Sequence, residues 1–131
     1  MREIKFRMWD GHAMQAVGTI KFHTDRSYHV NDEYPVNDAT MREKFGGNRY
    51  HLMQFTGLKD KNGCDIYEGD VLAHNLPSGE HPYAVAWMMG DGFNGWYAVI
   101  ENSNPKHFIS LEAFPPCEVI GNICENPELL S

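Results

Sequence analysis

Seven histidines in this 131-residue chain raise the possibility of a transition-metal site. They are His12, His23, His29, His51, His74, His81 and His107, and none has an i, i+2 partner on a clear strand or an i, i+4 partner on a helical pattern. A zinc site needs three or four ligands converging at about 2.0–2.3 Å, which small domains secure with short spacing motifs. We therefore expect surface or loop histidines, with no metal site and no cofactor.

The three cysteines, Cys64, Cys117 and Cys124, include no CxxC pair, which argues against a zinc site or a disulfide framework and suits a reducing cytosol. A cysteine nucleophile needs a pKa lowered by a nearby cation, histidine or helix N-terminus. Cys64 instead lies in a turn flanked by Asp60 and Asp65, whose negative charges would raise the pKa of its thiol. Cys117 and Cys124 fall on the last predicted strand, where small half-buried hydrophobes are expected.

Other catalytic patterns also lack the context that they need. No serine stands in a GxSxG elbow, and no glycine-rich stretch opens a helix with Lys-Ser or Lys-Thr. Glu68, Asp70 and Glu118 would have to converge for glycoside chemistry, and a solvated role suits each of them better. A phosphate-binding backbone nest at Glu68-Gly69-Asp70 is opposed by the surrounding carboxylates. We predict that the chain is not an enzyme and has no catalytic residues.

Aromatic residues exceed what the core of a minimal barrel needs. In "AVAWMM" and "GWYAVI", the alternation of side chains along a strand places Trp87 and Trp96 on the same face. Three interpretations are open: core packing, an exposed patch that binds a partner subunit, and stacking of single-stranded nucleic acid. The last of these also needs a positive groove, which only residues 1–26 could supply.

Charge is distributed unevenly along the chain. The formal net charge of -7 opposes non-specific attraction to DNA. Residues 1–30 nevertheless carry five basic groups against three acidic ones, while residues 101–131 carry one lysine against five glutamates. The two ends are either separately solvated or pair with each other, within a monomer or between subunits.

The elements that must position these residues are mostly strands. "REIKFRMW" alternates with period two, and Asp10-Gly11 then signals a hairpin that returns through "HAMQAV", with a further strand at "TIKFH". Residues 27–50 lack periodicity and predict a long loop with at most a short helix near "DATMREKF".

From His51 onward the strand signals become regular. "YHLMQFT", "CDIYEGDVLAH", "PYAVAWMM", "GWYAVIEN" and "CEVIGNIC" each contain a predicted strand, and "ENPELL" predicts a short helical turn. Asp60-Lys61-Asn62-Gly63 predicts a turn, Gly69 a bulge or close backbone approach, and Asp70 a carboxylate that accepts from neighbouring amides. Short strands at spacings of about 8–12 residues predict a small barrel or sandwich.

Four blocks give the chain a family resemblance: "MREIKFRMWD", "LMQFTGLKDKNG", "IYEGDVL" and "EVIGNICENPELL". Occurring together and in order, they resemble the YopX-like proteins of bacteriophages and prophages. The resemblance implies a phage-encoded, cytosolic, β-rich protein with an SH3-like barrel, and it implies no activity, cofactor or catalytic residue. The fold expected is thus mainly β, a β-rich α+β chain with an N-terminal β-hairpin segment and long loop (1–50) followed by a small SH3-like barrel (51–131).

These features predict a phage accessory protein in the cytoplasm of a bacterial host, acting as a non-enzymatic oligomeric or protein-binding module. The alternative is a nucleic-acid-binding accessory protein that uses the basic N-terminal segment. No apolar run is long enough to span a membrane, and "MREIKFRMWDGH" is too charged for a signal peptide.

We also expect the chain to self-associate or to bind a host or phage protein. The first strand is amphipathic and near a terminus, so as an edge strand it would pair with another chain. The candidate interface residues are Arg2, Lys5, Arg7, Trp9, Trp87 and Trp96, of which the basic ones would face glutamates near the C-terminus of a second copy.

Overall fold

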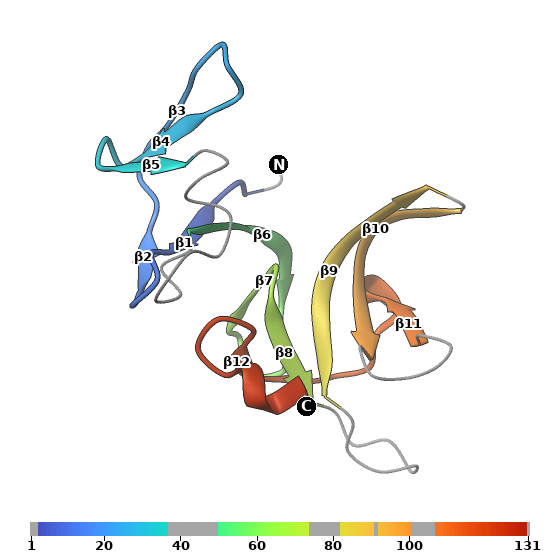
Figure 1. Cartoon of the computed structure of the whole chain (residues 1–131). Coiled ribbons are helices and arrows are strands. Elements are labelled where there is room, and N and C mark those ends of the chain that lie inside the picture. Colours follow the sequence, from blue (N-terminus) through green and yellow to red (C-terminus); the bar gives the residue numbers. More distant parts are fainter. Residues whose placement is uncertain (1–2, 37–49, 74–81, 91, 101–106, 131) are drawn as a thin grey trace. The chain divides into compact units, whose positions relative to one another are not determined.

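The structure is a computed structural model that describes residues 3–36, 50–73, 82–90, 92–100 and 107–130. Its regular elements are antiparallel strands and two short 3-10 helices, so the prediction of a mainly β chain is confirmed. The chain divides into two compact units, Glu3–Gln54 and a C-terminal unit that begins at Phe55 (Figure 1). The helix predicted near "DATMREKF" lies outside the described residues.

In the N-terminal unit, the predicted hairpin joins β1 (Phe6–Trp9) to β2 (Met14–Ala16). Its turn runs from Asp10 to Ala13, with Gly11 at a φ of 97° and both Asp10 carboxylate oxygens accepting hydrogen bonds. The other side of β1 pairs with the first half of β6 (His51–Lys59). Because β1 is flanked on both sides, the premise that it is an edge strand is wrong.

The same unit holds a three-stranded sheet of β3 (Ile20–Phe22), β4 (Tyr28–Val30) and β5 (Tyr34–Val36). The prediction that residues 27–50 form a loop is therefore wrong for β4 and β5. The two strands are joined through Asn31 and Asp32, whose φ angles of 55° and 56° are the positive values that a type I′ turn requires. Asn and Asp tolerate this region better than other residues with side chains, so Asn-Asp acts here as a hairpin signal without glycine.

In the described residues, the C-terminal unit is built from the second half of β6, six further strands and two short 3-10 helices. β7 (Asp65–Tyr67) pairs with β6, and a five-stranded sheet has the order β11-β10-β9-β8-β12. The bounds are β8 (Asp70–Ala73), β9 (Tyr83–Gly90), β10 (Phe93–Ile100), β11 (His107–Ser110) and β12 (Glu118–Asn122), with η1 (Leu111–Ala113) and η2 (Pro127–Leu130). Sequence periodicity missed β11 and η1.

The core of this unit lies on one face of the five-stranded sheet. Leu72, Val85 and Ala98 from the sheet pack with Ile66 of β7 and with Leu111 of η1, and all five are buried. Figure 1 shows β9 and β10 as a long curved ribbon that runs from this core to a hairpin tip. Burial is deep at the end of the two strands that holds Val85 and Ala98, and it declines toward the hairpin tip.

Candidate functional site

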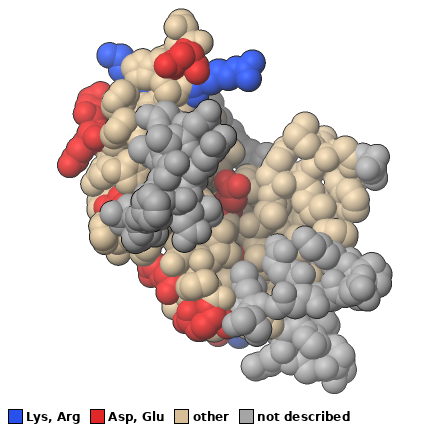
Figure 2. Space-filling view, viewed as in Figure 1, with Lys and Arg blue, Asp and Glu red and all other residues tan. Residues whose placement is uncertain are grey.

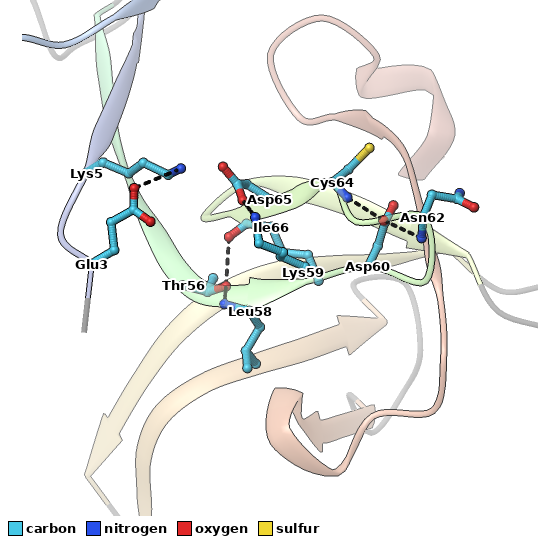
Figure 3. A network of polar contacts seen from close by, with 10 residues as sticks. All are labelled: Glu3, Lys5, Thr56, Leu58, Lys59, Asp60, Asn62, Cys64, Asp65 and Ile66. Carbon is cyan, nitrogen blue, oxygen red and sulfur yellow. Dashed lines mark hydrogen bonds and ion pairs between the residues drawn. The ribbon is translucent and has the colours of Figure 1, made fainter. Parts of the chain in front are cut away.

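The turn between β6 and β7 is organised by one carboxylate. Asp60 is 8% exposed, and its Oδ1 accepts hydrogen bonds from the backbone N–H groups of Asn62 and Cys64, both at 2.9 Å (Figure 3). Its Oδ2 accepts a third from the N–H of Val119 in β12, at 3.0 Å. The turn predicted at residues 60–63 is confirmed. Through the bond from Val119, its aspartate also connects this turn to β12, a strand much later in the chain.

Electrostatics at Asp60 favour the ionised form. Burial alone would raise the pKa of the Asp60 carboxyl, but the three amide hydrogen bonds and the charge of Lys61 outweigh it, so the pKa lies below its ordinary value. A carboxylate whose lone pairs are taken by three structural amides has little capacity left for a substrate proton. We therefore assign Asp60 a role in the fold.

The following bend is built in the same way. Gly69 has a φ of 84°, and its N–H and C=O bond to Val85 and Ile123 at 2.9 Å each. Asp70 is 1% exposed, and its Oδ2 accepts from the N–H of Tyr67 at 2.8 Å. The predictions that Gly69 permits a close backbone approach and that the Asp70 carboxylate accepts from a neighbouring amide are confirmed, whereas the solvated role expected of Asp70 is wrong, because its carboxylate is buried in the bend. Asp70 holds the turn between β7 and β8, while Glu118 is exposed at the start of β12.

The cysteines differ in accessibility. Cys64 is exposed, whereas Cys117 is buried in the core. Burial, with the nearby Asp60 charge, raises the pKa of the Cys117 thiol despite an opposing effect of Lys61, so its thiolate is disfavoured. Across the described part of the chain, no three side chains among His, Cys, Asp and Glu gather as metal ligands would. Within that same part, no helix is long and apolar enough to cross a membrane.

One pair of histidines does converge. His23 Nε2 and His29 Nδ1 are 2.7 Å apart near the turn end of the β3–β4 hairpin, with the rings edge to face. The sequence did not predict this pair, because residues 27–50 lack the periodicity of a strand and His29 was expected in a loop. Pairing "TIKFH" with "SYHV" as a hairpin would have found it. His74 and His81 lie outside the described residues, and for His107 only the backbone is described.

Trp87 and Trp96 form the most distinctive side-chain pair of the C-terminal unit. They are directly opposite each other in the β9–β10 ladder, so the prediction that they share a face is confirmed. Their ring centroids are 5.1 Å apart and their planes meet at 74°. Trp87 is 47% exposed, Trp96 is half-buried against the core, and Met89, next on the same face, is 75% exposed.

This pair borders a hollow of about 290 Å³ inside the C-terminal unit. β6 contributes Thr56 and Leu58 to the lining, and η1 contributes Glu112. The Thr56 hydroxyl donates to the Ile66 carbonyl at 2.7 Å and accepts from the Leu58 N–H at 3.2 Å, so it is already engaged (Figure 3). The remaining lining residues are Trp87, Asn94, Gly95, Trp96, Tyr97 and Ser110.

The N-terminal candidates are arranged differently. Lys5, Arg7 and Trp9 are all half-buried on or beside β1, and Lys5 Nζ lies 3.4 Å from Glu3 Oε1 (Figure 3). Arg2 lies outside the described residues. Lys5, Arg7 and Trp9 belong to the N-terminal unit, whereas Trp87 and Trp96 belong to the C-terminal one, so the five described interface candidates fall into two groups that we consider separately.

Fold and site together define an antiparallel β protein in which a curved two-stranded ribbon carries a partly exposed tryptophan pair. A family model described as "YopX protein" matches residues 5–131. The chain therefore belongs to the YopX protein family, and the resemblance found in the sequence is confirmed.

Two solved structures share the fold over nearly the whole chain. Protein EF1440 from Enterococcus faecalis is 26% identical, with 100% of each chain covered and a TM-score of 0.55. Protein yopX from Bacillus subtilis is 22% identical, with 97% of this chain and 98% of that chain covered and a TM-score of 0.59. No curated protein matches the chain.

Proposed function

We propose that this YopX-family chain is a non-enzymatic protein-binding module, and that the surface formed by Trp87, Met89 and Trp96 is its binding face. We call this surface the tryptophan face. One observation carries the proposal: β9 and β10 contain no charged residue, yet Trp87 and Met89 are 47% and 75% exposed. Interface cores are enriched in aromatic residues and methionine and depleted in charge.

The surface pattern in Figure 2 agrees with this proposal. In that view the area over β9 and β10 is mostly uncharged, whereas Lys and Arg atoms gather where Figure 1 places the β3–β4 hairpin. A nucleic-acid ligand stacked on the tryptophans would need a basic groove beside them, and the residues that line the hollow include no lysine or arginine. The nucleic-acid-binding alternative therefore has less support at this face.

The wider biological setting is part of the same proposal. As a YopX-family protein, the chain would be phage-encoded and would act in the cytoplasm of a bacterial host, on a host or phage protein or on a second copy of itself. We further propose that the C-terminal unit is a variant of an SH3-like barrel. The curved antiparallel order of β8 to β12, with β7 packed through Ile66 on its inner face, supports this description.

Affinity capture from host cells tests the binding face. The wild type is compared with Trp87→Ser/Met89→Ser and with Phe22→Ser, which removes a 74% exposed aromatic from the other unit. Because buried aromatic anchors dominate interfaces, the double variant should lose captured protein by about tenfold or more. Phe22→Ser should match the wild type. Equal capture by all three proteins, or capture only of nuclease-sensitive material, would refute the proposal.

A further inference from the structure

We propose that the hollow beside the tryptophan face binds the cationic head of an arginine or lysine side chain that a protein partner presents. This inference rests on the proposed function and specifies the chemistry of the partner. It is carried by three properties of the hollow: its aromatic walls, its charge and its size.

The aromatic walls come from the cross-strand tryptophan pair. With planes at 74° and centroids 5.1 Å apart, the two indoles form a corner in which a ring face stands beside a ring edge. Tryptophan is the best aromatic partner for a cation, which is attracted when it lies within about 6 Å of the ring centroid. Because Trp87 is 47% exposed, part of this corner is open to an incoming group.

The charge of the hollow comes from Glu112. Among the described residues that line the hollow, this exposed residue of η1 is the charged one, and no lysine or arginine lines the hollow with it. Neither the ion pair of Lys5 with Glu3 nor that of Lys59 with Asp65 involves Glu112. A carboxylate next to aromatic faces complements a guanidinium or an ammonium group.

The size suits a single side chain. At about 290 Å³ the hollow lies at or below the small end of ligand pockets, which span roughly 300–1,000 Å³. Leu58 offers an apolar surface against which the methylene stem of an arginine or lysine can pack. Such stems favour apolar contacts while the charged head remains in a polar environment. A second hollow of about 330 Å³ is lined by Lys59 and Lys61 as well as Glu112, and these two cations oppose the same ligand.

A peptide titration followed by NMR tests the inference. The probes are acetyl-Gly-Arg-Gly-amide, its lysine counterpart, and the citrulline analogue, which keeps the shape of arginine without its charge. The indole N–H signals of Trp87 and Trp96 should shift with the arginine or lysine peptide, while the Trp9 signal stays in place. The citrulline peptide should bind at least about threefold more weakly, since cation–π attraction at exposed sites is modest.

Glu112→Gln should weaken binding of the arginine peptide about two- to fivefold, the range expected for an exposed charge pair. Glu118→Gln, the same change at an exposed residue of β12, is the control and should bind like the wild type. Equal binding of the arginine and citrulline peptides, or no effect of Glu112→Gln, would overturn the inference. If Trp87→Ser/Met89→Ser still abolishes partner capture in that case, the proposed binding face stands and only the cationic ligand is refuted.

Discussion

Replacing Asp60 by asparagine tests whether the carboxylate in the β6–β7 turn stabilises the fold. Asparagine keeps an acceptor at Oδ1, so the bonds from Asn62 and Cys64, both at 2.9 Å, can remain. Its Nδ2 group, however, would face the Val119 N–H, which now donates to Oδ2 at 3.0 Å. Two donors would then meet where a donor and a charged acceptor stood.

A hydrogen bond to a charged group contributes about 1.5–3 kcal/mol, and Asp60→Asn should lower the free energy of unfolding by that amount. Asp60→Ala removes all three bonds and should cost about 3–5 kcal/mol. Urea unfolding at neutral pH, followed by circular dichroism, measures both. Asp65→Asn is the control, because its 2.6 Å ion pair with the largely exposed Lys59 predicts a loss of no more than about 1 kcal/mol.

The loss of stability caused by Asp60→Asn should depend on pH in a defined direction. Because the folded-state pKa of Asp60 is lowered, its contribution is fully present above the ordinary carboxyl value of 3.8 and is lost as pH falls below that value. The stability gap between wild type and Asp60→Asn should therefore be constant at neutral pH and shrink in acid. An Asp60→Asn protein as stable as Asp65→Asn would refute the reasoning, as would a gap that grows on acidification.

Two further predictions concern packing and thiol access. A Cβ added at Gly121 would lie 2.6 Å from Asn126 Oδ1, so Gly121→Ala should cost about 1–3 kcal/mol in thermal or urea unfolding. Gly18→Ala, with its nearest neighbour at an ordinary 3.7 Å, should be close to neutral, and equal losses would contradict the packing argument. A maleimide should label exposed Cys64 in the native protein well before buried Cys117, as mass spectrometry of peptides can show. Labelling of both at one rate would contradict the burial of Cys117.

Local signals explain what the sequence could predict. Period-two alternation identified β1, β6, β9 and β10, and it placed Trp87 and Trp96 on one face, as the ladder confirms. The Asp60 turn and the Asp70 bend were also predictable, because their bonds to Asn62 and Tyr67 span only a few residues. Each of these features depends on neighbours in sequence.

Features that depend on distant segments could not be predicted in the same way. The bond from the Val119 N–H to Asp60 joins residues 59 positions apart, and no spacing rule specifies it. The hollow requires Leu58 from β6 and Glu112 from η1 beside the tryptophans, and η1 itself carried no periodic signal. The Asn31-Asp32 turn was not predicted for another reason, since it contains no glycine and both positive φ angles fall on residues with side chains.

Photo-crosslinking at the tryptophan face tests the central proposal most directly. A benzoylphenylalanine placed at Met89, which is 75% exposed, reports what contacts this surface in the host cell, and the same group at Phe22 is the control on the other unit. We predict a nuclease-resistant adduct with protein, either a partner or a second copy of the chain, formed from position 89 and not from position 22. Equal yields from the two positions, or an adduct with nucleic acid alone, would contradict the account.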